Sequence, residues 1–189
     1  MDQSAVLHLF RSSGALLEGH FKLSSGLHSP GYLQCALVLQ HPAHAEALGR
    51  ALAPALASLG ATAVLSPALG GLIIGHEVGR ALGIRAIFAE RQDAVLTLRR
   101  GFHLDAADRV VVIEDVVTTG GSTRETMAVA RAAGATVAGA GAIIDRSGGD
   151  QGLDAPFHAL VTLSLPTYPP ESCPLCAAGL PVTKPGSRT

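Results

Sequence analysis

Residues 110–125 read VVVIEDVVTTGGSTRE. The apolar run at 110–113 is typical of a parallel strand that is buried on both faces. The run ends at two acids, Glu114 and Asp115, at the carboxyl end of the predicted strand, where open α/β sheets bind their ligands. Two adjacent carboxylates can accept hydrogen bonds from a ribose diol or help to organise a divalent cation.

A loop rich in hydroxyl groups and glycine follows the two acids. The loop consists of Thr118, Thr119, Gly120, Gly121, Ser122 and Thr123. Its unhindered amides at the start of a predicted helix form a phosphate-binding arrangement. Ser122 and Glu125 also fit an S-x-x-E capping box, which occurs in proteins that bind nothing. The box explains neither the paired acids nor the Thr-Thr-Gly-Gly run, so the segment favours a sugar-phosphate site. It matches neither a Walker A motif nor a dinucleotide fingerprint.

Apolar runs alternate with Ala-rich helical stretches along the chain, which predicts an α/β fold with an open, mostly parallel sheet flanked by helices. The predicted strands are 63–66, 85–89, 109–114, 136–145 and 159–165. The predicted helices are 44–59, 72–82 and 123–133. Pro54 predicts a kink or a later start in the first helix. Glycines at 71, 75, 79 and 83 recur every four residues and predict close packing of the second helix.

The composition is that of one soluble globular domain, with 189 residues, 48% apolar residues and a formal net charge of −1. We expect a single domain with an N-terminal section to about residue 40, a core at about 60–165 and a Pro-rich tail at about 166–189. The near-neutral charge argues against a nucleic-acid partner. Lys22 and Lys184 are the two lysines of the sequence, so most positive charge is on arginine, which suits bidentate binding of phosphate or carboxylate.

The N-terminus has no basic region followed by a long apolar segment, and no run of about 18 apolar residues predicts a membrane span. We therefore expect a cytoplasmic protein with no membrane partner. Cys35, Cys173 and Cys176 are too few for a secreted disulfide framework. The last two have the C-x-x-C spacing of half a zinc site or of a redox pair. Further zinc ligands could come only from distant histidines or a second subunit, so the sequence favours packing cysteines.

The segment EDVVTTGGST at 114–123 resembles the loop that binds 5-phosphoribosyl 1-diphosphate (PRPP) in the type I phosphoribosyltransferases. Within that family the chain looks most like the orotate-using members, over almost its whole length. GHFKLSSGLHSPGYLQ at 19–34 is similar to their orotate-side segment, and SPALGGLIIG at 66–75 resembles their diphosphate loop. IFAERQ at 87–92 resembles the strand end that carries an arginine, and Asp145-Arg146 resembles an Asp-Arg pair whose arginine holds the base.

The resemblance implies a glycosyltransferase of class EC 2.4.2.10, which moves the phosphoribosyl group of PRPP to orotate in pyrimidine synthesis. Mg2+ would arrive with PRPP, without a direct protein ligand. The implied catalytic residues are Arg91, Glu114 and Asp115. The implied PRPP-binding residues are these three with Val116, Val117, Thr118, Thr119, Gly120, Gly121, Ser122, Leu69 and Gly70. The implied orotate-binding residues are Thr118, Arg146, Ser25, Tyr32 and Leu33.

The resemblance also implies a hood over the site and a homodimer whose hood is shared between subunits. Arg99, Arg100 and His103 are the candidate hood residues. Known members carry lysines in the hood, in the diphosphate loop and before the Ser-Gly of the N-terminal segment. This chain has Leu69-Gly70-Gly71 and Ser24 at the last two places, so we expect arginines, Arg91 first, to replace the missing lysines.

Two alternatives share the PRPP loop. The first is a phosphoribosyltransferase for another base, a purine or uracil, because base recognition depends on fewer residues than PRPP binding. The second is a PRPP-sensing regulator on the same fold that binds RNA or DNA. A regulator of that kind should show a basic face or an added DNA-binding domain, and the net charge of −1 argues against it.

Overall fold

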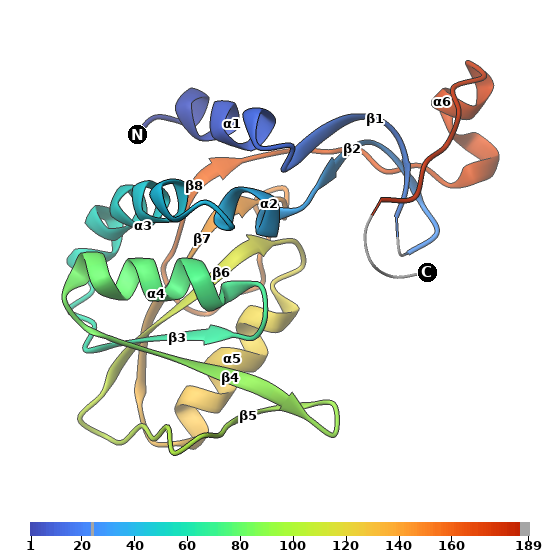
Figure 1. Cartoon of the computed structure of the whole chain (residues 1–189). Helices are drawn as coiled ribbons and strands as arrows, with labels where there is room; N and C mark the ends of the chain where they lie inside the picture. The colour runs from blue at the N-terminus through green and yellow to red at the C-terminus, as the bar shows by residue number, and fades with distance from the viewer. Residues whose placement is uncertain (24, 186–189) are drawn as a thin grey trace.

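The computed structural model describes residues 1–23 and 25–185, and its main body is a six-stranded sheet with helices on both faces (Figure 1). The strand order is β5-β4-β3-β6-β7-β8. The strands are β3 Ala63–Pro67, β4 Arg85–Gln92, β5 Val95–Leu98, β6 Arg109–Val117, β7 Thr136–Asp145 and β8 Phe157–Thr162. All neighbours pair in parallel except β4 and β5, which form an antiparallel hairpin. The predicted open, mostly parallel sheet is confirmed.

Helices α3 Pro42–Ala57 and α4 Gly71–Leu82 cover one face of the sheet, and α5 Gly121–Ala132 covers the other (Figure 1). Strand β6 contributes to both cores because successive side chains point to opposite faces. Val111 and Ile113 pack with the core of α3 and α4, whereas Val110 and Val112 pack with that of α5. This explains the continuous apolar run at the start of β6.

The glycines of α4 allow the helix to approach the sheet closely, as predicted. A Cβ on Gly71 would lie 2.7 Å from the carbonyl oxygen of Ile113, and one on Gly75 would overlap the hydroxyl of Ser66. Gly83 has another role, because it ends the helix in the left-handed conformation with φ 70°. The glycine spacing therefore reflects packing rather than ligand binding.

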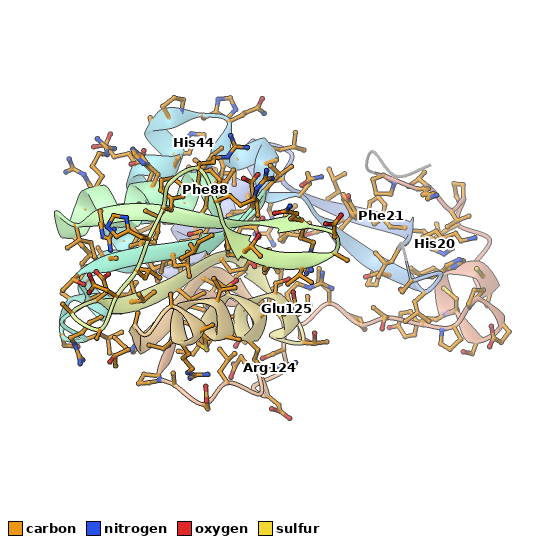
Figure 2. All side chains as sticks on the ribbon, turned by 90° about the horizontal axis from the view of Figure 1, so that it is seen from below. His20, Phe21, His44, Phe88, Arg124 and Glu125 are labelled. Atoms are coloured by element: carbon orange, nitrogen blue, oxygen red, sulfur yellow. The ribbon has the colours of Figure 1, made fainter. Side chains whose placement is uncertain are left out.

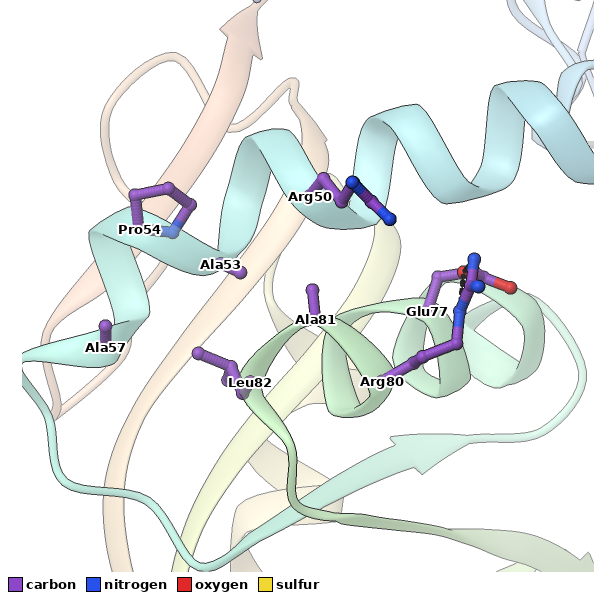
Figure 3. A pocket seen from close by; sticks show the side chains of 8 residues that line it. All are labelled: Arg50, Ala53, Pro54, Ala57, Glu77, Arg80, Ala81 and Leu82. Atoms are coloured by element: carbon purple, nitrogen blue, oxygen red, sulfur yellow. Dashed lines mark hydrogen bonds and ion pairs between the residues drawn. The ribbon is translucent and has the colours of Figure 1, made fainter.

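Helices α3 and α4 are also in close contact, since a Cβ on Gly49 would lie 2.6 Å from the Cβ of Glu77. Beside this contact a groove of about 420 Å³ is lined by the second halves of both helices (Figure 3). Those halves lead into β3 and β4, so the groove lies where the parallel strands begin. Helix α3 starts at Pro42, earlier than predicted, and Pro54 is accommodated in its last turn.

The N-terminal section forms α1 Gln3–Ser12, a hairpin of β1 Leu16–Lys22 and β2 His28–Leu33, and α2 Cys35–Leu39. The hairpin projects from the main body and meets the C-terminal tail, which contains η1 Pro170–Ser172 and α6 Pro174–Ala177 (Figure 1). Two single β-bridges join hairpin and tail, Phe21 with Thr183 and His28 with Tyr168. Among the described residues, no helix has both the length and the apolar character that a membrane span requires.

Candidate active site

The order in which the chain adds strands to the sheet reverses between β3 and β6, so the carboxyl ends of these two strands form a switch point. The chain continues from β3 to β4 on one side and from β6 to β7 on the other, and α/β proteins bind ligands at such a switch point. The loops after the two strands touch there, because a Cβ on Gly70 would lie 2.8 Å from Asp115 Oδ1. Leu69, next to Gly70, is 82% exposed. The structure thus brings the predicted diphosphate loop and the acid pair together.

Glu114 and Asp115 are an acid pair largely removed from solvent. Burial, followed by the charge of Asp115, raises the pKa of Glu114 to about 8. Burial also raises the pKa of Asp115, although Asp115 Oδ1 accepts a hydrogen bond of 2.8 Å from the Val116 amide. Without a ligand the pair therefore retains a proton at neutral pH. Hydroxyl donors or a cation brought by a ligand would stabilise its ionised form.

The loop after β6 encloses a small polar cavity of about 60 Å³. It is lined by Glu114, Val116, Val117, Thr118, Thr119, Gly120, Gly121, Ser122 and Thr123. Its lining of hydroxyl groups and helix-start amides suits a small anionic group. Helix α5 starts here with Gly120 as N-cap, at φ 70°, and no side chain caps it. The alternative capping box of Ser122 and Glu125 is not formed, so the first-turn amides face the cavity without a capping side chain.

Arg124 holds this loop in place, a role that the sequence analysis did not predict. Its Nη1 donates to the carbonyl oxygens of Thr119 and Gln151, both at 2.8 Å. Gln151 belongs to the segment after β7, so Arg124 joins the two loops that end neighbouring strands. Figure 2 shows Arg124 and Glu125 at the start of α5. The one feature of the sequence that could have indicated this role is the position of Arg124 directly after Ser122 and Thr123 of the loop.

Arg91 lies at the carboxyl end of β4, where the sequence analysis expected it. Its Nη2 donates to Glu125 Oε2 at 2.6 Å, and the side chain is about half exposed. The ion pair places Arg91 beside the first turn of α5, at the same edge of the sheet as the acid pair. Because the pair is accessible to solvent, the guanidinium can exchange Glu125 for a phosphate without a large cost.

The structure does not bring Arg99, Arg100 and His103 into this site. They follow β5, which runs antiparallel to β4 and leads the chain back along β4, away from its carboxyl end. Arg100 pairs with Glu90 at 2.9 Å, and the carbonyl of His103 accepts from Arg85, the first residue of β4. The expectation of a hood shared between subunits stays a prediction, because the structure describes a single chain.

Arg146 follows β7 and is half-buried beside the end of β6, where its amide donates to the Val117 carbonyl at 2.7 Å. Burial lowers the pKa of its guanidinium. Within the described part of the chain, its buried Nε has no hydrogen-bond partner. A buried donor without a partner is costly, so this position favours an acceptor supplied by a ligand.

The remaining candidates lie on the N-terminal hairpin. Ser25 is in the turn between β1 and β2, and Ser24 lies outside the described residues. Tyr32 packs near Phe21, with ring centroids 6.0 Å apart, and Leu33 packs on the main core. The chain then enters α2, where the charges of Asp115 and Glu114, after burial itself, raise the pKa of Cys35. The base of the hairpin therefore approaches the acid pair, whereas Ser25 is at its projecting end.

Comparisons with known proteins agree with this geometry. No family model matches the chain. It is 52% identical over 188 residues to the orotate phosphoribosyltransferase of Pelotomaculum thermopropionicum, covering 100% of this chain and 99% of that protein. It is 54% identical over 192 residues to that of Heliobacterium modesticaldum, covering 100% of both.

Solved structures show the same fold. Orotate phosphoribosyltransferase from Aeropyrum pernix superposes with a TM-score of 0.70 at 25% identity, covering 84% of this chain and 93% of that one. The Mycobacterium tuberculosis orotate phosphoribosyltransferase in complex with PRPP gives a TM-score of 0.69 at 21% identity, covering 86% and 97%.

An open sheet with an acid pair and a glycine-rich loop at its switch point defines a type I phosphoribosyltransferase fold. Relatives that are about half identical over the full chain narrow this class further. The chain belongs to the orotate phosphoribosyltransferase family.

Proposed function

We propose that this chain transfers the 5-phosphoribosyl group of PRPP to N1 of orotate, giving orotidine 5'-monophosphate and diphosphate in pyrimidine nucleotide synthesis. The observation that carries the proposal is the buried acid pair beside an anion-sized cavity at the switch point of the sheet. Full-length similarity to orotate phosphoribosyltransferases supports the choice of orotate as the base.

No protein nucleophile is required, so the site acts by positioning and by electrostatic stabilisation. The loop from Thr118 to Ser122 would hold the 5'-phosphate, with the start of α5 favouring its negative charge. Glu114 and Asp115 would accept hydrogen bonds from the ribose hydroxyls. Their ionised form would stabilise the positive charge that develops on the ribose ring as the bond to diphosphate breaks. Leu69, Gly70 and Arg91 would contact the diphosphate.

The site also fits the Mg2+ that PRPP would bring. Oxygen donors are the ligands that Mg2+ prefers, and a nearby cation would favour the ionised forms of Glu114 and Asp115, whose pKa values are raised by burial. We assign these two side chains to the surroundings of the ion, which is held chiefly by PRPP. When bound, Mg2+ supplies charge neutralisation of the leaving diphosphate.

Arg146 would bind orotate, because a planar guanidinium pairs in two places with a carboxylate or with adjacent ring oxygens. Its buried Nε without a partner supports this assignment. Thr118 would contact the base from the phosphate loop. Tyr32 and Leu33 would close the base side from the hairpin, together with Ser25 at its turn.

We also propose a homodimer in which the β4–β5 hairpin reaches the neighbouring subunit. This hairpin projects beyond the main sheet (Figure 1), and its Val95 is 62% exposed. A shared hood would bring Arg99, Arg100 and His103 over the diphosphate of the neighbouring subunit. We place the protein in the cytoplasm, because three cysteines are too few for the disulfide framework of a secreted protein.

The direct test is diphosphate release from PRPP and Mg2+ with orotate, uracil, hypoxanthine, adenine or xanthine offered in turn. We expect release with orotate alone. Asp115→Asn is the matched control, which should fold as the wild type does and release little diphosphate. Release with a purine or uracil instead of orotate would assign another base, and no release with any base would exclude the proposed enzyme.

A further inference from the structure

We propose that His20, His28, Cys173 and Cys176 form a structural zinc site that joins the N-terminal hairpin to the C-terminal tail. The four side chains come from segments more than 140 residues apart, and their ligand atoms all lie within 4.8 Å of one another. His20, His28 and Cys173 are buried. Two imidazoles and two thiolates are a ligand set that zinc binds in closed, four-coordinate sites.

The distances between the ligand atoms fit a tetrahedron around one ion. Zn–N bonds of about 2.0–2.1 Å and Zn–S bonds of about 2.3 Å place neighbouring N and S atoms about 3.5 Å apart. Cys173 Sγ and Cys176 Sγ lie 3.6 and 3.7 Å from His20 Nε2, and Cys176 Sγ lies 3.3 Å from His28 Nδ1. The two nitrogens are 2.8 Å apart and would separate by about 0.5 Å around zinc.

A hydrogen bond outside the cluster fixes the orientation of His20. Its Nδ1 lies 2.8 Å from the carbonyl oxygen of Leu180, an acceptor, so Nδ1 carries the proton. In the neutral imidazole the free lone pair is then on the other ring nitrogen, Nε2, which faces both sulfur atoms. Metal-binding histidines usually hold their second nitrogen in this way, and the interaction raises the basicity of the ligand.

The tail has almost no apolar core of its own. Between residues 166 and 185, all of which the structure describes, Cys173 is the one buried residue. The tail nevertheless follows a defined course, with backbone hydrogen bonds from Lys22 to Thr183 and in both directions between His28 and Tyr168. Small modules without an apolar core usually need a metal or a disulfide. Figure 2 shows His20 on the hairpin where it faces the tail.

Two thiolates and two neutral imidazoles match the charge of one Zn2+ ion. Zinc binding deprotonates both thiols, releases two protons and leaves two thiolates that offset the charge of Zn2+, so the complex is neutral in its buried position. A redox pair of Cys173 and Cys176 would leave the two buried imidazoles unexplained. With four protein ligands no position remains for substrate, so the ion holds the hairpin against the tail and takes no part in catalysis.

Metal content is the first test. Protein expressed in zinc-supplemented medium should hold one zinc per chain by mass spectrometry of the metals, and Cys176→Ser and His20→Ala should each lose most of it. Cys35→Ala is the matched control, because Cys35 lies outside the cluster, and it should retain the ion. Replacement by Co2+ should give the intense visible bands of tetrahedral thiolate coordination.

A chelator applied to the wild-type chain tests the structural role without relying on a variant that folds. Zinc removal should lower the Tm and speed amide hydrogen exchange in 20–32 and 168–183 at least tenfold, while 110–113 stays protected. Wild-type protein without zinc and without the Co2+ bands would overturn the proposal. A mass lower by two hydrogens, mapped to a disulfide between Cys173 and Cys176, would also overturn it.

Discussion

Glu114 is 7% exposed at the end of an apolar strand, next to a second acid. Without a ligand, the folded chain would be more stable with a neutral side chain at this position, because burial opposes the ionised form of the carboxyl group. In the proposed reaction, ribose hydroxyls and a developing positive charge would both favour a carboxylate at this position. At this residue stability and catalysis therefore have opposite requirements.

Glu114→Gln should make the ligand-free chain more stable and less active. The pKa of Glu114 rises from its ordinary value of 4.5 to about 8 on folding, so between these pH values the folded chain keeps a proton that the unfolded chain loses. The free energy of unfolding of the wild type should therefore fall as pH rises through this window, by at most about 1.4 kcal/mol per pH unit.

Urea unfolding from pH 5 to pH 8 checks this prediction. The Gln variant should have a flatter profile than the wild type and greater stability at pH 8, and its kcat/KM for PRPP should be about 10- to 100-fold lower. Glu18→Gln is the control, because the Glu18 side chain is 74% exposed, and it should leave both quantities unchanged. Parallel profiles for wild type and Glu114→Gln would contradict the assigned pKa.

Arg146→Ala should weaken the binding of orotate and leave the binding of PRPP nearly unchanged. Loss of a charged hydrogen-bonding partner costs about 1.5–3 kcal/mol, so KM for orotate should rise about 10- to 150-fold. KM for PRPP should change less than threefold. Steady-state kinetics with each substrate varied give both values. Arg131→Ala, which removes a surface arginine paired with Asp154, is the matched control. An equal rise in both KM values would place Arg146 in the PRPP site instead.

At the scale of elements, the strand-loop-helix unit from β6 to α5 was predictable from sequence because several local signals coincide in it. The apolar run, the two acids and the Thr-Gly loop specify a buried strand, a polar turn and a helix start in sequence. Strand β7 was predicted with the observed bounds, Thr136–Asp145. The core strands and helices thus depend on local patterns that a single sequence shows.

Other elements depend on contacts that no local pattern reveals. Strand β1 was missed because its buried and exposed positions do not alternate. Strand β8 was predicted two residues late, since Leu163 and Leu165 look like strand residues but pack in the segment beyond it. The spacing of residues in the sequence could not identify the four proposed zinc ligands, because only the fold brings two distant histidines to the C-x-x-C pair.

Gly120→Ala should disable the phosphate loop. Residue 120 has φ 70°, and a Cβ there would overlap the Gln151 carbonyl oxygen, so the loop must move. KM for PRPP should rise at least tenfold. Gly14→Ala is a matched control, with the same φ of 70° and no atom within 4 Å of the added Cβ. Both variants should lose about 1–2 kcal/mol from the left-handed backbone, but Gly14→Ala should bind PRPP normally. Calorimetric titration with PRPP distinguishes them.

At the scale of the whole molecule, one chain provides most of a site and leaves its hood incomplete. The acid pair, the phosphate loop and Arg91 lie at the carboxyl ends of the strands. Arg99 and Arg100 pair with Glu90 on β4, and the carbonyl of His103 accepts from Arg85 at the start of that strand. The β4–β5 hairpin is the element that can carry residues toward a second copy. Assembly is therefore part of the proposed catalytic unit.

Light scattering after gel filtration should give a mass of about twice the 19.2 kDa of one chain. Val95→Glu should shift the equilibrium toward monomer and lower kcat, because it places a charge on the exposed apolar end of the hairpin. Leu180→Glu is the control, since Leu180 is also an exposed apolar residue but lies on the tail. A wild-type monomer with full activity would exclude a shared hood.

The junction of hairpin and tail also sets an order of events during synthesis. His20 and Cys173 are 153 residues apart, and Phe21 pairs with Thr183, so the hairpin cannot acquire these partners until residues 173–183 have left the ribosome. The sheet from β3 to β8 is translated earlier and can assemble first, because domains generally fold as their residues emerge. A nascent chain can therefore form the sheet with the loop at 118–123 before its hairpin is joined to residues 168–183.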